Sequence, residues 1–145
     1  MDDTTVIAFD VVPTDPSRPL SLAVEIDGRP IWNRTVTELH TVTVPLLDID
    51  HGLHCLRWIV SGKKSEYTVL DSHGTIVSDS LIQLRNVTID EIDISSMLHT
   101  VAKYTHDCNG TSSLASYPLY SDMGCNGHAE MTFSTPLYLW LLEHI

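Results

Sequence analysis

The chain has 145 residues, 43% hydrophobic and 19% charged, a balance typical of one globular domain with its own core. Its 19 acidic and 8 basic residues give a formal net charge of −11. This charge argues against binding to nucleic acid or to an anionic membrane surface, because both need clustered Lys and Arg. The apolar runs are shorter than the roughly 20 residues of a membrane span. The N-terminus lacks the pattern of a secretory signal, so we expect folding in the cytoplasm where the chain is made.

β-Strand patterns dominate the first two-thirds of the chain. Residues 6–12 are apolar and β-branched and lead into a Pro-rich loop, whereas residues 20–26 alternate apolar with small or polar side chains. Asp27-Gly28 is a strong two-residue turn signal and predicts a hairpin whose second strand starts near Pro30. Further strands are predicted over residues 40–46, 53–62, 67–70, 76–80 and 81–89, with residues 90–94 as a continuation of the last strand after a bulge.

The last third of the chain is less regular. Residues 95–102 fit either a short helix or a loop. Asn109-Gly110 and Asn126-Gly127 each predict a tight reversal, because Asn tolerates a positive φ and Gly adopts it freely. We expect an irregular excursion between these two reversals, and a strand over residues 129–133 after the second one.

The chain ends in an apolar segment that needs cover. Thr135-Pro136 interrupts the last predicted strand, because proline cannot donate to a strand ladder. Residues 137–142 are apolar without alternation, so they fit a strand buried on both faces or a short helix. We expect the segment to close the domain and to dock on a neighbouring subunit through Pro136, Leu137, Tyr138, Leu139, Trp140, Leu141 and Leu142.

These elements predict an all-β fold with about eight antiparallel strands and at most one short helix, arranged as a β-sandwich or jelly roll. Residues 1–145 form a single domain. Within it, residues 1–19 supply the first strand and the Pro-rich loop, residues 20–94 the sandwich core, and residues 95–145 the closing strands, the excursion and the apolar C-terminal segment.

Cysteine chemistry is weakly supported by the sequence. Three cysteines, an odd number, argue against a disulfide framework and fit a reducing compartment. Cys108 and Cys125 each precede an Asn-Gly pair and could be neighbours in space, so their pairing stays open. Cys108 follows His106 and Asp107 too closely for a catalytic triad, since neighbours on a strand point to opposite faces. With no catalytic constellation localised, we expect a protein that is not an enzyme.

Acidic turns make calcium the best-supported metal. Hard cations need several carboxylate or carbonyl oxygens, and four turn carboxylates offer them: Asp48, Asp50, Asp90 and Asp93. The histidines are scattered, and no short-spaced Cys or His pair is present to hold zinc. A second polar cluster is predicted near the turn at residues 62–64 from His54, Lys63, Asp79, His106 and Asp107. The alternative for His54 is a hydrogen-bonded position on a sheet face.

Three aromatic residues are candidates for a platform on which a sugar ring stacks. Trp32 comes just after the predicted hairpin turn, and packing at a sandwich edge is its alternative role. Tyr117 and Tyr120 lie in a loop with Ser and Pro, where contact with a partner is plausible. Trp58, inside an apolar strand, is expected in the core.

Part of this pattern resembles a known fold family. The segment Gly52-Leu53-His54-Cys55-Leu56-Arg57-Trp58 follows the Asp27-Gly28 turn and Trp32, and an Asp79-Ser80 strand then closes on Ile89-Asp90-Glu91-Ile92. This order resembles the jelly-roll sandwiches of carbohydrate-binding modules over roughly half of the chain. The resemblance implies a glycan ligand, and related sandwiches commonly hold a structural calcium ion.

The last 45 residues carry a second resemblance. His106-Asp107-x-Asn109-Gly110, Met123-Gly124-Cys125-Asn126-Gly127 and the terminus from Pro136 to Glu143 are similar to uncharacterised small acidic proteins of tailed bacteriophages. That similarity implies a source and a virion setting rather than an activity.

Two functional hypotheses follow. The first is a non-enzymatic structural subunit of a tailed-bacteriophage virion, in a decoration, neck, baseplate or fibre position. It would be synthesised in the host cytoplasm, would form a homo-oligomer and would contact other virion proteins. The alternative is a calcium-dependent glycan-binding adhesion module that contacts a host surface polysaccharide.

Overall fold

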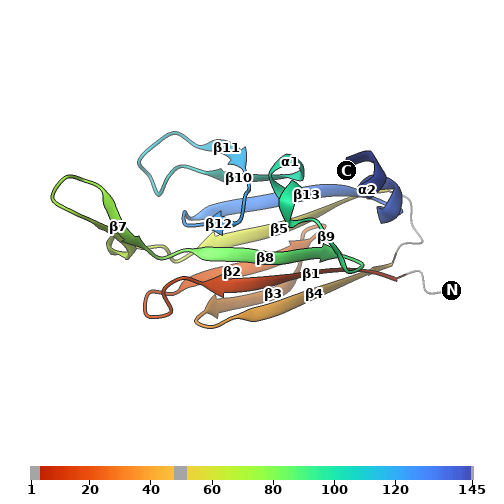
Figure 1. Cartoon of the computed structure of the whole chain (residues 1–145), viewed down its shortest axis with the longest axis horizontal. Coiled ribbons are helices and arrows are strands. Elements are labelled where there is room, and N and C mark those ends of the chain that lie inside the picture. The colour runs from red at the N-terminus through yellow and green to blue at the C-terminus, as the bar shows by residue number, and fades with distance from the viewer. Residues whose placement is uncertain (1–3, 48–51, 145) are drawn as a thin grey trace.

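The computed structural model describes residues 4–47 and 52–144, which form a sandwich of two antiparallel sheets (Figure 1). One sheet has the order β12-β8-β1-β4, with β9 paired to β8. Its strands are β1 (Thr4–Pro13), β4 (His40–Leu47), β8 (Ile82–Ile89), β9 (Ile92–Asp93) and β12 (Asp122–Met123).

The second sheet has the order β11-β10-β13-β5-β2-β3. Its strands are β2 (Leu20–Ile26), β3 (Arg29–Val36), β5 (Gly52–Ser61), β10 (Ala102–His106), β11 (Ala115–Pro118) and β13 (Gly127–Thr135). β3 and β11 are therefore the two opposite edges of this sheet. About five inter-strand spacings separate them, a distance on the order of 24 Å.

Smaller elements lie at the two ends of the sandwich. A hairpin of β6 (Thr68–Leu70) and β7 (Ile76–Asp79), preceded by the 3₁₀ turn η1 (Ser65–Tyr67), projects from one end. The helix α2 (Leu137–His144) packs at the other end (Figure 1). The 3₁₀ turn η2 (Ser95–Met97) and the helical turn α1 (Leu98–Val101) lead into β10.

The core forms where alternate strand residues face inward. In β2, Leu20, Leu22, Val24 and Ile26 are buried, as the alternation in the sequence predicts. Trp58 from β5 is fully buried, as expected, and meets Phe9 of the opposite sheet edge-to-face, with ring centroids 5.6 Å apart. Such a contact fastens the two sheets together.

The all-β sandwich class is confirmed, but the described residues contain thirteen strands rather than about eight. Several of the extra strands, such as β9 and β12, have only two residues, too few to show alternation in the sequence. The segment 95–102 contains the single turn α1, and the apolar run after Pro136 is the helix α2 rather than a strand. None of the described helices is long and apolar enough to cross a membrane.

Two of the three predicted Asx-Gly turns are confirmed. Asp27-Gly28 takes φ values of 51° and 80° and joins β2 to β3, and Asn109-Gly110 takes 58° and 88°. The prediction for Asn126-Gly127 is wrong, because neither residue has a positive φ and Gly127 begins β13. A Cβ on Gly127 would lie 2.3 Å from the Thr105 carbonyl oxygen, so glycine is required there by the close approach of β10.

Candidate functional site

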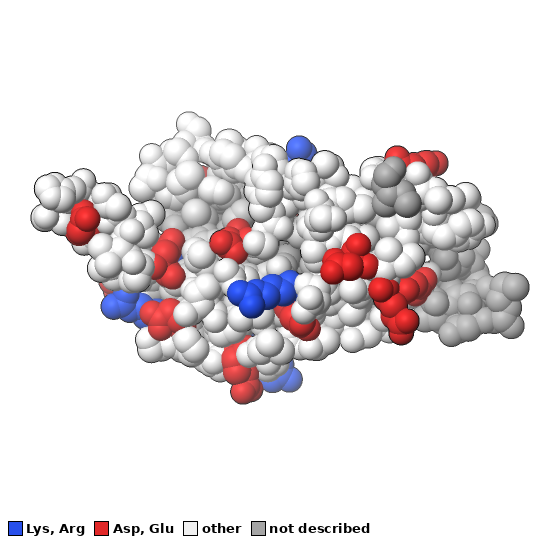
Figure 2. Space-filling view, in the orientation of Figure 1, with Lys and Arg blue, Asp and Glu red and all other residues white. Residues whose placement is uncertain are grey.

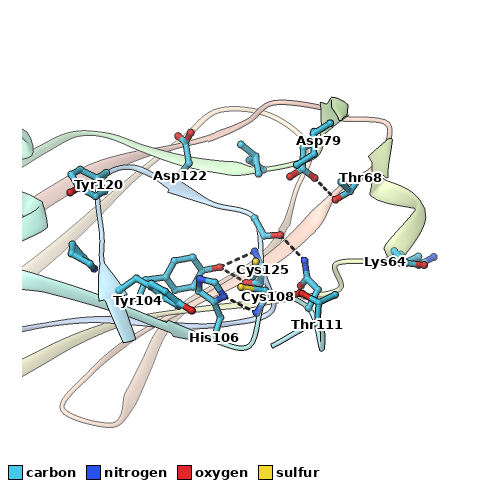
Figure 3. A pocket seen from close by; sticks show the side chains of 17 residues that line it. Lys64, Thr68, Asp79, Tyr104, His106, Cys108, Thr111, Tyr120, Asp122 and Cys125 are labelled. Carbon is cyan, nitrogen blue, oxygen red and sulfur yellow. Dashed lines mark hydrogen bonds between the residues drawn. The ribbon is translucent and has the colours of Figure 1, made fainter. Parts of the chain in front are cut away.

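A cleft of about 750 Å³ opens beside the projecting β6–β7 hairpin. Its walls come from η1, β6, β7, β10, β11, β12 and the loops that join them, so segments far apart in the sequence meet here (Figure 3). The lining side chains include Thr68, Asp79, Tyr104, His106, Cys108, Tyr117, Tyr120, Asp122 and Cys125.

One wall of the cleft is a row of three rings. Tyr104 and Tyr117 are direct partners in the β10–β11 register, and His106 shares the face of Tyr104 because strand residues two apart point the same way. The His106 ring lies 4.8 Å from the Tyr117 ring in a stacked geometry and 4.6 Å from the Tyr104 ring. Tyr104 is buried, whereas Tyr117 is 38% exposed. The row therefore presents a fixed aromatic surface at its open end.

A second exposed ring is fixed in the same manner. Tyr120 is 66% exposed, yet its ring stacks on His99 from α1 at 5.2 Å, with only 7° between the planes. A histidine thus lies behind each of the two exposed tyrosines. Rings held in this way lose little conformational freedom when a ligand stacks on them.

The β10–β11 loop is tied to the segment before β13 at the inner end of the cleft. The Tyr104 hydroxyl donates to the Cys125 carbonyl oxygen and accepts from the Cys125 N–H at 2.9 Å. Asn109 bonds to both neighbours of Cys125: its Nδ2 donates to the Gly124 carbonyl at 3.3 Å, and its Oδ1 accepts from the Asn126 N–H at 3.0 Å. The inner end of the cleft is thereby held in one arrangement.

Burial and a backbone bond set the charge state of His106. The Cys108 N–H donates to His106 Nδ1 at 3.0 Å, so this nitrogen carries no proton. Burial lowers the pKa of His106 from its ordinary 6.5, and the neighbouring Asp107 carboxylate opposes that shift only in part. The ring therefore presents a neutral surface at physiological pH.

An ion pair anchors the projecting hairpin to the sandwich. The Lys63 side chain is only 2% exposed, and its Nζ donates to Asp79 Oδ1 and to the Ser80 carbonyl oxygen, the latter at 2.6 Å. Asp79 Oδ1 also accepts from the Thr68 hydroxyl at 2.7 Å (Figure 3). The Lys63 backbone is bonded in turn to the Asn126 side chain through its N–H and its carbonyl. The lysine thus connects the hairpin to the cleft floor.

The predicted polar cluster forms only in part. Lys63 and Asp79 pair directly, and His106 shares the cleft with Asp79. His54 lies elsewhere: its Nδ1 is 2.7 Å from Asp27 Oδ2, which holds the turn between β2 and β3 against β5. The alternative interpretation of His54, a hydrogen-bonded residue on a sheet face, is therefore correct.

His54 belongs to an Asp-His-Thr chain that the sequence did not reveal. Its Nε2 is 3.5 Å from Thr135 Oγ1, and Asp27 lies on the other side of the ring. The order resembles that of a nucleophilic triad. However, Thr135 is only 5% exposed and its hydroxyl is also 3.5 Å from the Gly52 carbonyl. This Asp-His-Thr series of contacts therefore holds the ends of β5 and β13 together.

The three predicted sugar-stacking residues do not share one site. Tyr117 and Tyr120 both line the cleft. Trp32 lies on β3, at the opposite edge of the same sheet, where it is half-buried against His40 with ring centroids 5.6 Å apart. The histidines behind the tyrosines were missed, although the spacing of His106 from Tyr104 is the period-two signal of a shared strand face.

The structure describes only two of the four predicted calcium ligands. Asp48 and Asp50 lie outside the described residues. Asp90 and Asp93 lie around β9, and each has one carboxylate oxygen bonded to a backbone N–H at 2.8 Å, from Val6 and Ser95 respectively. Across residues 4–47 and 52–144, no group of three His, Cys, Asp or Glu side chains is arranged to hold a metal. The described part of the chain alone therefore does not complete the predicted calcium site.

The predicted docking segment divides into two faces. Leu137, Trp140 and Leu141 are buried, and Trp140 packs edge-to-face on Phe133 of β13, with ring centroids 6.3 Å apart. Tyr138, Leu139 and Leu142 are 62%, 47% and 65% exposed. Half of the apolar segment thus closes this chain's own core, and the other half remains at the surface.

Charge around the cleft is sparse, and its few carboxylates and lysines roughly balance. Asp79 is paired with Lys63, whereas Asp122 is exposed and Lys64 at the rim lies 5.9 Å from the Tyr67 ring centroid. Figure 2 shows acidic side chains scattered over the visible face, with few basic ones among them. The site thus lacks the cluster of cations that an anionic ligand would need.

No protein-family model and no curated protein matches this chain. Two solved structures are similar to it. The selenomethionine form of vCBM60, from work on circular permutation between two families of calcium-dependent carbohydrate binding modules, has a TM-score of 0.54 at 11% identity, covering 88% of this chain and 89% of that one. vCBM60 in complex with galactobiose has a TM-score of 0.49 at 12% identity, covering 87% of this chain and 96% of that one.

The first of these likenesses defines the class of fold. The chain is a β-sandwich whose fold is similar to that of this carbohydrate binding module. The resemblance predicted from residues 20–94 is confirmed at the level of fold, and it extends over most of the chain rather than about half. At such low identity the likeness concerns the fold alone, so the function has to be argued from the site.

Proposed function

We propose that this protein is a non-enzymatic glycan-binding module that holds neutral sugar rings in the cleft against Tyr117 and Tyr120. The observation that carries the proposal is the pair of exposed tyrosine rings, each stacked on a histidine behind it. Sugar rings expose an apolar face, and a pocket lined by fixed aromatic rings with a few polar groups is suited to such a ligand. The fold similarity to a carbohydrate-binding module supports the same interpretation.

The polar groups of the cleft suit hydroxyls rather than charges. Asp122, Thr111 and the amide of Asn109 line it and offer hydrogen bonds to sugar hydroxyl groups. An exposed carboxylate would repel the carboxylate or sulfate groups of an anionic polysaccharide, and the net charge of −11 would add to that repulsion. The proposed ligand is therefore a neutral polysaccharide, such as one on a host surface.

Calcium is a part of this proposal that can be tested separately. The vCBM60 form described above comes from work on calcium-dependent modules. In this chain Asp90 and Asp93 would supply two carboxylates, and the remaining candidates are Asp48 and Asp50. A bound calcium ion would neutralise these carboxylates and fix the turns that carry them.

Binding to soluble neutral glucans, galactans and mannans tests the glycan proposal by calorimetry, with and without chelator. We expect Tyr117→Ala and Tyr120→Ala each to weaken binding about tenfold, since each removes one stacking surface. Tyr138→Ala is a matched control, because Tyr138 is exposed to a similar extent as Tyr120 but lies on α2. Unchanged affinity in both cleft variants would contradict the proposal, and a loss in Trp32→Ala would instead move the site to the β3 edge.

A second candidate function is the virion subunit implied by the resemblance of the C-terminal third. The observation that favours it is the apolar outer face of α2, formed by Tyr138, Leu139 and Leu142. Figure 1 places α2 at the end of the sandwich opposite the β6–β7 hairpin. A subunit docked through α2 would therefore leave the cleft open, so the two functions are compatible in one homo-oligomeric virion protein.

Sedimentation of the purified chain tests the subunit proposal. We expect an oligomer for the native chain and a folded monomer when Tyr138, Leu139 and Leu142 are all replaced by Ser. The triple variant should also fail to enter particles when it is co-expressed with the other virion proteins. A native chain that stays monomeric at high concentration and is absent from particles would contradict this role.

A further inference from the structure

Two of the three cysteines meet at the inner end of the cleft. Cys108 follows β10 and Cys125 precedes β13, and both side chains line the cleft (Figure 3), where Cys108 lies near enough to contribute to the raised pKa of the Cys125 thiol. We propose that Cys108 and Cys125 are a thiol pair that forms a reversible disulfide and so cross-links the β10–β11 loop to the segment before β13. The proposal does not depend on glycan binding.

The Asn109 side chain holds the two cysteines in register. It bonds to Gly124 at 3.3 Å and to Asn126 at 3.0 Å, the two residues that flank Cys125. Cys108 is the chain neighbour of Asn109, so it is placed next to Cys125 by the same bonds. Cys108 and Asn109 take positive φ values of 53° and 58°, which turn the loop back toward the cleft at this point.

Both partners are fixed before any bond forms. Cys125 is held through both backbone groups by the Tyr104 hydroxyl. The Cys108 N–H is held by His106 Nδ1 at 3.0 Å. Because disulfide geometry tolerates little displacement of the backbone, such restraint favours this pairing over others.

The third cysteine is too far away to compete. Cys55 lies opposite Thr132 in the β5–β13 register, five residues along β13 from Gly127 and therefore about 17 Å from the strand end that Cys125 precedes. Its sulfur is 3.4 Å from Glu130 Oε2. Cys55 is thus a built-in control.

Oxidised glutathione, a small disulfide, would supply the oxidising equivalents. The Cys108 thiol loses its proton to solvent, and the thiolate attacks one sulfur of the glutathione disulfide, which releases one glutathione thiolate and leaves a mixed disulfide on Cys108. The Cys125 thiolate then attacks the Cys108 sulfur and releases the second glutathione. The protein is oxidised by two electrons, and one glutathione disulfide becomes two thiols.

The surroundings of Cys125 favour this order of attack. Burial and the adjacent Cys108 raise the pKa of the Cys125 thiol, so little of it is thiolate at neutral pH. We therefore expect Cys125 to act as the resolving cysteine. Once its partner carries glutathione, the attack is intramolecular and is favoured by proximity.

The test uses the full reduced chain incubated with oxidised glutathione, followed by alkylation of the remaining thiols, intact mass and peptide mapping. We expect two of the three thiols to be lost, no glutathione adduct to remain and one cross-linked peptide pair that joins Cys108 to Cys125. Cys55→Ser should behave identically, whereas Cys108→Ser and Cys125→Ser should form no intramolecular cross-link. Dithiothreitol should reverse the reaction.

A thermal unfolding measurement gives a second readout. A disulfide that closes the segment from Cys108 to Cys125 should raise the melting temperature of the oxidised chain by roughly 10 °C over the reduced chain. Stable glutathione adducts on both cysteines, a cross-link that includes Cys55, or intermolecular dimers through Cys108 or Cys125 would each overturn the proposal. If either Ser variant fails to fold, the peptide map of the native chain decides alone.

Discussion

The Tyr104 hydroxyl bonds to both backbone groups of Cys125, donating to its carbonyl oxygen and accepting from its N–H at 2.9 Å. Tyr104 is 5% exposed, and its burial raises the pKa of the phenol well above its ordinary value, so the hydroxyl keeps its proton. Cys125 lies two residues before β13 begins. The single Tyr104 oxygen from β10 therefore takes the place of strand partners for both backbone groups of Cys125. The inner end of the cleft depends on this contact.

The variant Tyr104→Phe tests that dependence. It removes one hydroxyl and leaves the N–H and carbonyl of Cys125 without their partner in a partly buried place. We expect the free energy of unfolding in urea to fall by about 2 kcal/mol. Tyr117→Phe, which loses an exposed hydroxyl from the neighbouring strand, should change it by less than about 0.5 kcal/mol. Equal effects of the two variants would show that the hydroxyl of Tyr104 contributes nothing specific.

Substitutions of the adjacent residues Lys63 and Lys64 provide a second pair of matched variants. Lys63→Met leaves the carboxylate of Asp79 without its cation and the Ser80 carbonyl without a donor, so we expect a loss of about 3 kcal/mol in unfolding free energy. Lys64→Met, at the exposed neighbouring position, should cost at most about 0.5 kcal/mol.

A double-mutant cycle with Asp79→Asn then separates the ion pair from general packing. The loss from Lys63→Met should be smaller when it is made in the Asp79→Asn variant, because no unpaired charge remains there. Strict additivity of the two changes would contradict a direct interaction between Lys63 and Asp79.

Stability should depend on pH through His106. The pKa of His106 is lowered from 6.5 by burial, so the unfolded chain binds more protons than the folded chain between these two values. Its contribution is therefore fully present above pH 6.5 and is lost as the pH falls through the folded-state pKa. Protonation of Nδ1 would also break the bond from the Cys108 N–H.

Urea unfolding between about pH 5 and 8 measures this effect. The groups next to the ring are Tyr104, Tyr117, Cys108 and Asp107, and the Asp107 carboxylate is the one that opposes the lowering of the His106 pKa. We expect the His106→Gln variant to show a shallower fall in stability below pH 6.5 than the native chain. The pKa of Glu130, lowered from 4.5 by Arg57, acts only at lower pH and is common to both proteins. Identical pH profiles would exclude His106 as the titrating group.

The same Leu→Ala substitution should change the unfolding free energy by very different amounts on the two faces of α2. Leu137 is 1% exposed, so Leu137→Ala should cost about 3 kcal/mol in unfolding free energy through the cavity it leaves. Leu142 is 65% exposed, so Leu142→Ala in the monomer should cost less than about 0.5 kcal/mol. Removal of residues 136–145 should be more damaging than either, because it uncovers Phe133 and the end of β13. A truncated chain of native stability would show that α2 is not part of the core.

Much of the framework was predictable because it depends on local patterns. The alternation in residues 20–26 and the Asp27-Gly28 turn define β2, the hairpin and the inward face, since a side-chain period of two leaves one register that buries Leu20, Leu22, Val24 and Ile26. The length of strand and the position of turns follow from such runs. Segments of two residues, such as β12, are too short to carry a period.

Individual residues of the cleft were predictable from the sequence, but the way they come together was not. Tyr117 and Tyr120 could be chosen as exposed aromatics from the loop around them, but their partners His106 and His99 come from β10 and α1, and only the strand pairing and the position of the helical turn bring them together. Trp32 was chosen from its place after a hairpin turn, yet the order of strands places it at the far edge of the sheet.

By itself, the amino-acid sequence determined the all-β class, the main strands and the acidic, cation-poor surface, because these depend on composition and on periodicity over a few residues. Tertiary structure alone decided which rings form the cleft wall, which cysteines are neighbours and which half of α2 is buried. Those properties depend on contacts between residues distant in sequence, and the gain from such contacts appears only once the sheets have closed on one another.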